Sequence, residues 1–283
     1  MTQSGASDVV LDAFGASDRG LVRDTNEDHF VIASIRKSVD VRQTSVPDAA
    51  ITGHFGASSA NLFAVADGVG GKAGGELASE STVSSLLEYL GRAAGCFHGL
   101  DASQEMELID RLEESVRIAH ERLLNEFGDA GSAPATTLTM VMLAWPRAYF
   151  VHVGDSRAYV MRKDRLQRLT RDQTLGEYMV SAGAWTAEQA ARPGPANTLT
   201  SAIGGPEVSP SVGLIDLAPG DAILLCTDGL TRHVSDERIA EVLRARPGAE
   251  ATCRQLIQEA LSGGGADNVT VLSVFAGNPA ASA

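Results

Sequence analysis

Short apolar runs that end in an acidic residue beside glycine constrain this chain more than any other feature. The clearest is Leu62–Ala66, which is followed at once by Asp67 and by a glycine-rich stretch over 68–75. Five apolar residues are too few for a helix and suit a strand buried on both faces. Because glycine lacks a Cβ, a metal, water or phosphate can approach its backbone closely. Taken alone, the pattern fits equally well an ordinary strand and turn with Asp67 as a turn residue.

The same pattern recurs along the chain. Acidic residues flank four further apolar runs: Glu27 and Asp28 before 30–32, Asp155 after 150–153, Asp228 after 223–226, and Asp267 before 269–272. Buried like charges repel one another strongly unless a cation or protons neutralise them. Oxygen-only ligation suits Mg²⁺ or Mn²⁺ and argues against zinc. The sequence therefore predicts a metal site lined by carboxylates.

Composition excludes several classes of protein. The 283 residues carry a formal net charge of −13 without any basic run, which argues against nucleic acid and anionic membranes as partners. Cys96, Cys226 and Cys253 lack ligand spacing, so neither a disulfide framework nor a zinc site is expected. Since no apolar stretch approaches 18 residues and the first fifteen lack signal-peptide features, we expect a cytoplasmic protein.

Strand-like and helix-like segments are clustered rather than alternating, which favours an α+β fold with packed antiparallel sheets in a single domain over 1–283. We expect an insertion loop or hairpin at 36–60 and a disordered tail at 277–283. Segments 136–144, 148–153 and 158–162 are predicted to form an antiparallel meander. Other expected strands are 9–17, 28–35, 166–169, 212–216, 221–226 and 268–275, and expected helices are 76–90, 103–127, 175–182, 186–191, 235–244 and 249–262.

The acidic segments, taken in order, resemble the metal-dependent protein serine/threonine phosphatases of type 2C, the PPM family, in its bacterial form. The resemblance extends from about residue 14 to 274. Any one segment is a weak signal, whereas seven in the family's order are specific. They are Arg23–Asp28, Asp67–Gly71, Gly154–Tyr159, Leu169–Asp172, Leu199–Gly204, Thr227–Leu230 and Asp267–Thr270.

This resemblance implies a four-layer αββα sandwich, two antiparallel β-sheets flanked by helices, with two Mn²⁺ or Mg²⁺ ions at one end. It implies hydrolysis of phosphoserine and phosphothreonine by a water that bridges the two metals. Two divalent cations would neutralise a phosphate dianion, and an arginine is a natural bidentate phosphate clamp. The implied roles are Asp67 as the bridging ligand, Asp228 and Asp267 at one metal, Glu27 and the Gly68 carbonyl at the other, Asp28 in the water shell, and Arg23 on the substrate phosphate.

The chain also departs from the family pattern. Asp155 matches the position linked to a third, weaker metal, although turn chemistry explains it equally well. Arg232 stands where many relatives carry an acidic residue, and its guanidinium would repel a cation or pair with Asp155. We therefore expect the third metal site to be weak or absent. Val69 replaces a histidine proposed as general acid in eukaryotic relatives, and neither His29 nor His152 is assigned that role.

The resemblance thus implies a phosphoprotein phosphatase with a flap over 175–197, acting in signalling on the substrates of a Hanks-type serine/threonine kinase. We expect it to be a monomer. Three alternatives stay open. The first is a catalytically weak relative that acts as a regulatory binding module. The others are a different metal hydrolase, such as a nuclease, and a phosphatase for small metabolites. The choice between Mg²⁺ and Mn²⁺, the physiological substrate and the general acid are also open.

Overall fold

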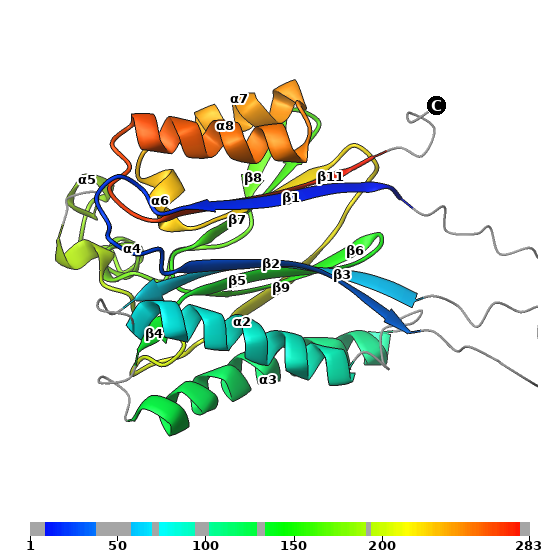
Figure 1. Ribbon diagram of the computed structural model, residues 1–283, viewed down its shortest axis with the longest axis horizontal. Coiled ribbons are helices and arrows are strands. Elements are labelled where there is room, and N and C mark those ends of the chain that lie inside the picture. The colour runs from blue at the N-terminus through cyan, green and yellow to red at the C-terminus, as the bar shows by residue number, and fades with distance from the viewer. Residues whose placement is uncertain are drawn as a thin grey trace, which may run out of the picture.

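The computed structural model describes residues 9–37, 58–69, 74–93, 102–128, 134–190 and 194–277. Figure 1 shows four layers, in which two β-sheets lie face to face and each outer face is covered by a pair of helices. All strand pairs within the two sheets are antiparallel. The predicted α+β sandwich is confirmed.

The first sheet brings together strands from both ends of the described chain. Its order is β1 (Leu11–Asp18), β11 (Val269–Ala276), β10 (Ala222–Cys226), β7 (Arg157–Arg162) and β8 (Arg165–Arg168). Its outer face is covered by α7 (Asp236–Ala245) and α8 (Ala249–Ser262). The Ser235 side chain caps α7 by accepting a hydrogen bond from the Arg238 backbone N–H.

The second sheet carries the longest strands. Its order is β2 (Asp28–Lys37), β3 (Ser58–Val69), β5 (Leu138–Ala144), β6 (Arg147–Val153) and β9 (Ser211–Asp216), with β4 (Ala135–Thr136) also paired to β3. Helices α2 (Gly74–Ala93) and α3 (Ala102–Phe127) cover its outer face. The remaining short elements are α4 (Leu175–Ser181), α5 (Ala187–Ala190), the 3₁₀ helix η2 (Pro195–Asn197) and α6 (Asp228–Thr231).

Strand β3 lies at the centre of the core. Leu62 and Ala64 pack toward the helices, whereas Phe63 and Val65 pack between the two sheets. All four are at most 1% exposed, so the predicted strand buried on both faces is confirmed. Burying each large apolar side chain stabilises the fold by about 1.5–3 kcal/mol.

The apolar residues of the helix predicted over 76–90 do not all face the core. In α2, Val83, Leu86 and Leu90 are buried, as is Ala78, but Leu77 and Leu87 are 45% and 38% exposed. The buried residues form one stripe along the helix, and Leu77 and Leu87 lie outside it. A helix lying on a sheet buries only such a stripe.

The predicted meander over 136–162 is also wrong in one respect. Strands β5 and β6 pair with each other, but β7 pairs with β8 and β10 in the other sheet. Gly154–Ser156 therefore carries the chain from one sheet to the other instead of closing a hairpin. Gly154 has a φ of +103°, and a Cβ there would lie 2.5 Å from the Thr137 side chain, so only glycine suits this crossing.

The expected insertion at 36–60 is shorter than predicted. Strands β2 and β3 extend into it and pair as far as Lys37 opposite Ser58, so its ends belong to the sheet. Residues 38–57 lie outside the described residues, as do Cys96, part of the glycine-rich stretch (70–73), part of the expected flap (191–193) and residues 278–283 of the predicted tail. Gly277, where the predicted tail begins, is described, and its N–H donates to the Val10 carbonyl at 2.8 Å. The assignment of 1–283 to a single domain stays a prediction.

Candidate metal and phosphate site

The acidic residues gather where strands of both sheets end. Strand β2 begins at Asp28, whose direct partner across the antiparallel pair is Asp67 near the end of β3. Residues directly opposite each other in this arrangement project to the same face of the sheet. Two carboxylates placed in this way repel each other, so this position requires a cation or protons.

Asp28 is 5% exposed and is held by two hydroxyl groups. Its Oδ2 accepts hydrogen bonds from Thr227 Oγ1 at 2.8 Å and Thr270 Oγ1 at 2.7 Å. Burial raises the pKa of Asp28 to about 7, although these two hydrogen bonds act in the opposite direction. Thr270 lies in β11 and Thr227 directly follows β10, so Asp28 links the two sheets at this end.

Asp67 is positioned through its backbone. Its N–H donates to Thr137 Oγ1 at 3.1 Å, and its carbonyl accepts from Thr136 Oγ1 at 2.8 Å and from the Thr137 N–H at 2.9 Å. Burial first, and then the negative charges of Asp28, Asp228 and Asp155, raise the pKa of Asp67 well above its usual range. A buried carboxylate that is surrounded by like charges is stabilised in its ionised form by a nearby cation.

Glu27, Gly68 and Gly75 form a tight backbone cradle beside Asp67. The Glu27 carbonyl accepts from the Gly68 N–H at 3.1 Å and from Ser79 Oγ at 2.6 Å. A Cβ at Gly68 would lie 2.2 Å from the Gly75 carbonyl oxygen, so no other residue fits there. The glycine that the sequence marks for close backbone approach is therefore required sterically.

Asp228 and Asp267 lie side by side at the same end of the first sheet. Asp228 follows β10 as the first residue of α6, and Asp267 precedes β11, the neighbour of β10. Arg23 binds Asp267 through two contacts, Nε to Oδ1 at 2.7 Å and Nη2 to Oδ2 at 2.9 Å. Burial raises the pKa of Asp228, against the opposing charge of Arg232.

Arg232 does not pair with Asp155, which was one of the two outcomes expected from the sequence. It forms an ion pair with Asp228 and donates from Nη1 to Asp267 Oδ2 at 2.6 Å. The reason is local, because residues four apart on a helix face the same side and α6 begins at Asp228. Asp155 has no ion-pair partner among the described residues, and burial followed by the charge of Asp228 raises its pKa to about 7.

The donor atoms fit divalent cations that prefer oxygen. Among the described residues, three buried carboxylate oxygens have no hydrogen-bond partner: Glu27 Oε1, Asp28 Oδ1 and Asp228 Oδ1. A buried, unpaired carboxylate oxygen is costly, and Mg²⁺ or Mn²⁺ binds such oxygens. Among the described residues, no three acidic, histidine or cysteine side chains form one compact ligand cluster. Asp267 is paired with Arg23 and Arg232, and Asp228 is paired with Arg232.

Asn268 organises the loop that carries Arg23 and Glu27, a role that sequence reasoning missed. Its Nδ2 donates to the carbonyls of Arg19 and Thr25, both at 2.8 Å, and its Oδ1 accepts from the Glu27 N–H at 2.9 Å. The only signal in the sequence was its place directly after Asp267. Thr227 and Thr270, which also lie in the quoted motifs, were likewise given no role.

Two other polar residues near the site have structural roles. His152 is fully buried, with Nδ1 2.8 Å from Thr139 Oγ1 and Nε2 3.0 Å from the Arg171 carbonyl oxygen. Burial lowers the pKa of His152 to about 4, so it is a core histidine. Asp172 forms ion pairs with Arg157 at 2.7 Å and with Arg168.

Comparison with known proteins places this arrangement in a family. The family model described as Protein phosphatase 2C matches residues 41–263, well over half of the chain. The chain belongs to the protein phosphatase 2C family. Among its relatives, the serine/threonine protein phosphatase PstP of Mycobacterium tuberculosis is 34% identical over 266 residues. That match covers 93% of this chain but 45% of PstP, so the chain spans about half the length of this relative.

Other relatives are similar in length or in fold. A putative protein phosphatase 2C-type from Streptococcus pyogenes is 32% identical over 219 residues, covering 75% of this chain and 85% of that protein. The crystal structure of the catalytic domain of PstP in complex with two manganese ions matches with a TM-score of 0.71 and 32% identity. That match covers 95% of this chain and 100% of the other. The two-sheet architecture is thus that of the family.

Proposed function

We propose that this protein is a Mn²⁺- or Mg²⁺-dependent phosphatase that hydrolyses phosphoserine and phosphothreonine in proteins. The observation that carries the proposal is the set of unpaired, buried carboxylate oxygens beside Arg23, at the end of two sheets. Such a set provides oxygen ligands for divalent cations and a guanidinium for a phosphate in one place. The two manganese ions of the PstP catalytic domain support the choice of cofactor.

Two divalent cations at this site would supply positive charge against the phosphate dianion and lower the pKa of an attacking water. In our proposal Asp67 would hold both cations, Asp228 and Asp267 would hold one, and Glu27 with the Gly68 carbonyl would hold the other. Asp28, which accepts from Thr227 and Thr270, would orient water beside them. Asp155, which feels the charge of Asp228, would serve only the third, weaker cation site.

Arg23 is proposed to bind the substrate phosphate. Its side chain is 47% exposed, and its contacts to Asp267 show that two of its nitrogens can bind one planar anion. Replacing Arg23 with lysine keeps the positive charge but removes the planar guanidinium that can donate two parallel hydrogen bonds to one phosphate. We expect Arg23→Lys to raise the KM for a phosphothreonine peptide about tenfold, with a smaller change in kcat.

Arg19→Lys is the matched control, because Arg19 lies in the same loop but donates to the Asp24 carbonyl. Steady-state kinetics on both variants provide the measurement. An unchanged KM in Arg23→Lys would remove Arg23 from the phosphate site.

Arg232 is the basis for proposing two metals rather than three. A guanidinium beside Asp228 and Asp267 opposes a further cation. We expect Arg232→Asp to raise the Mn²⁺ stoichiometry from two to three per chain, as measured by calorimetry. Arg232→Gln, which removes the charge without adding a ligand, should stay at two. Three ions bound to the unmodified chain would contradict this assignment.

We also propose that residues 175–197 form a substrate-selecting flap. Its two ends are joined by a bridge between Thr174 and Leu199, with the Leu175 N–H donating to the Thr198 carbonyl at 2.8 Å. Helix α4 and η2 contact each other within it. The described parts of the segment, 175–190 and 194–197, consist of short helices and turns, and a segment fixed at its base can move beside the site.

The proposed setting is a cytoplasmic monomer that acts in signalling on phosphoproteins made by a Hanks-type kinase. In the described part of the chain, no helix has the length and apolar character needed to cross a bilayer.

The deciding experiment is hydrolysis of a phosphothreonine peptide in Mn²⁺, abolished by EDTA. Metal binding without turnover would favour the regulatory module. Faster turnover of small phosphorylated metabolites would favour the metabolite phosphatase, and salt-dependent DNA binding would favour a nuclease.

A further inference from the structure

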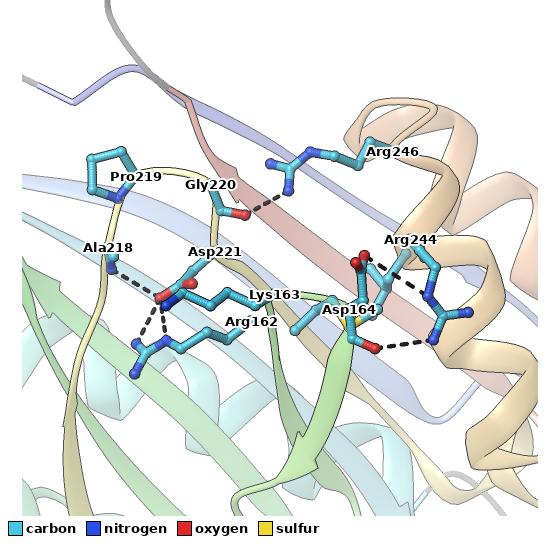
Figure 2. Close-up of a pocket in the computed structure, with 11 residues that line it drawn as sticks. Arg162, Lys163, Asp164, Ala218, Pro219, Gly220, Asp221, Arg244 and Arg246 are labelled. Carbon is cyan, nitrogen blue, oxygen red and sulfur yellow. Dashed lines mark hydrogen bonds and ion pairs between the residues drawn. The ribbon is translucent and has the colours of Figure 1, made fainter.

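A second charged site lies at the opposite end of the first sheet. A cavity of about 240 Å³ is enclosed by the β7–β8 turn, the β9–β10 turn and the last turn of α7 (Figure 2). Ala222 pairs with Met161 at the cavity end of the sheet, and Cys226 pairs with Arg157 at the carboxylate end. At about 3.4 Å per residue, the two ends lie roughly 14 Å apart along β10.

The cavity is basic although the chain is acidic. Four cationic side chains line it against two carboxylates, in a protein whose formal net charge is −13. The cations are Arg162, Lys163, Arg244 and Arg246, and the acids are Asp164 and Asp221. Asp221 is buried, and its Oδ2 binds Arg162 at 2.6 Å and accepts from the Ala218 N–H at 2.8 Å. Three cations therefore face a single remaining carboxylate.

Among the described residues, these three cations have weak carboxylate partners or none. Arg246 donates to the Gly220 carbonyl at 2.5 Å and lies over the Phe275 ring at 5.4 Å, which fixes its position without a carboxylate. Arg244 donates to the Asp164 carbonyl at 3.0 Å, while the carboxylate of that residue is 3.9 Å away and 81% exposed. Lys163 has no ion-pair partner within the described ranges.

The turn that presents Lys163 adopts an unfavourable backbone. Lys163 and Asp164 have φ angles of +46° and +64°, a region where two-residue hairpin turns favour Asn-Gly. A turn that served only to reverse the chain would be more stable with those residues. The choice of Lys and Asp therefore points to a use for the side chains.

Helix α7 explains part of this arrangement. Cations at a helix C-terminus are favoured by the helix dipole, which accounts for Arg244 and Arg246 at the end of α7. The dipole does not account for Lys163, which comes from a different element. Nor does it explain why Arg246 is fixed against the β9–β10 turn.

We infer that this cavity binds a second phosphoryl group of a phosphorylated protein substrate, apart from the group being hydrolysed. The inference rests on the proposed phosphatase function. Arginine and lysine together are the usual donors to phosphate, and Arg246 is already held in place. Because the rest of the surface carries excess negative charge, a basic cavity at this distance would select and orient multiply phosphorylated segments.

The test compares two peptides on the Mn²⁺-loaded full chain. One carries a single phosphothreonine, and the other carries two, six residues apart, a span of about 20 Å when extended. We expect the KM for the doubly phosphorylated peptide to be about tenfold lower. In the double variant Lys163→Gln/Arg246→Gln, the KM values for the two peptides should become equal, while the turnover of p-nitrophenyl phosphate stays unchanged.

Arg254→Gln is the matched control. Arg254 is 66% exposed and lies over the Phe14 ring at 5.5 Å, but it is outside the cavity. This variant should keep the tenfold difference, and Arg246→Lys introduced with intact Lys163 should keep most of it. Equal KM values for both peptides in the unmodified chain would overturn the inference. A double variant that keeps the tenfold difference in KM between the two peptides would also overturn it, whatever its thermal stability.

Two further measurements separate the sources of phosphate and the two proposals. Calorimetry with inorganic phosphate should show weaker binding in the double variant, together with a raised KM for the doubly phosphorylated peptide. Loss of phosphate binding with unchanged peptide KM would assign the cavity to the free ion and overturn the substrate role. If p-nitrophenyl phosphate is not hydrolysed at all, the phosphatase proposal fails, and calorimetric binding of the doubly phosphorylated peptide still tests the cavity.

Discussion

Replacing Asp67 with asparagine should abolish Mn²⁺-dependent hydrolysis of a phosphothreonine peptide and weaken Mn²⁺ binding more than about 100-fold, beyond the loss seen on removing an outer-shell partner. The reason is the position of Asp67 opposite Asp28 and close to Asp228 and Asp155. An amide in that position offers one neutral oxygen and no charge. Calorimetry for Mn²⁺ and steady-state kinetics on the same preparation provide the two readouts.

The variant should not be unfolded, and this separates loss of a ligand from loss of the fold. Removing one of two opposing carboxylates relieves repulsion, so metal-free Asp67→Asn should be at least as heat-stable as the unmodified chain above pH 7. Asp228→Asn should likewise lose turnover. Asp110→Asn, on the exposed face of α3, is the matched control and should change neither property. Turnover that survives in Asp67→Asn or Asp228→Asn would disprove the site assignment.

In EDTA, the melting temperature should fall as the pH rises from about 5 to 8. Burial raises the pKa values of Asp28 and Asp155 to about 7, and it raises those of Asp67 and Asp228 as well. The folded state thus holds protons that the unfolded chain, with ordinary carboxyl pKa values near 4, releases. The stabilisation is complete below the unfolded pKa and is lost as the pH passes the folded pKa.

Saturating Mn²⁺ should reverse this dependence. The cations replace the protons, and binding to the folded state alone adds about 2.7 kcal/mol of stability at 100 times the dissociation constant. Because cation binding requires ionised carboxylates, the gain should grow with pH. Differential scanning calorimetry at pH 5.5 and 8.0, with Mn²⁺ or with EDTA, measures both effects. A metal-free melting temperature that rises with pH over this range would contradict the raised pKa values.

The strands that form the site could be predicted because their signal is local. The runs 62–66 and 223–226 are apolar on both faces, and the structure buries them on both faces. The change of sheet at Gly154–Ser156 could not be predicted in this way. A glycine and two small polar residues look the same in a hairpin and in a crossing, and the partners of β7 that decide between them lie elsewhere in the chain.

The polar contacts that complete the site escaped prediction for a similar reason. Thr227 and Thr270 bind Asp28 across 199 and 242 residues of sequence, so no spacing rule links them. The departure at Arg232 was visible in the sequence, but its partners were not. Helix α6 starts at Asp228, which directs Arg232 toward Asp228 and Asp267, and this short helix was not predicted.

The pairing of β1 with β11 has a consequence for biosynthesis. Leu11 lies opposite Ala276, and Arg23 contacts Asp267 across 244 residues, so the proposed phosphate and metal groups meet only after the last strand has been translated. Contacts this distant in sequence form slowly and late in folding. A ribosome-bound nascent chain stalled before residue 267 should therefore be inert toward phosphoproteins, and activity should appear only after β11 has left the exit tunnel and inserted between β1 and β10.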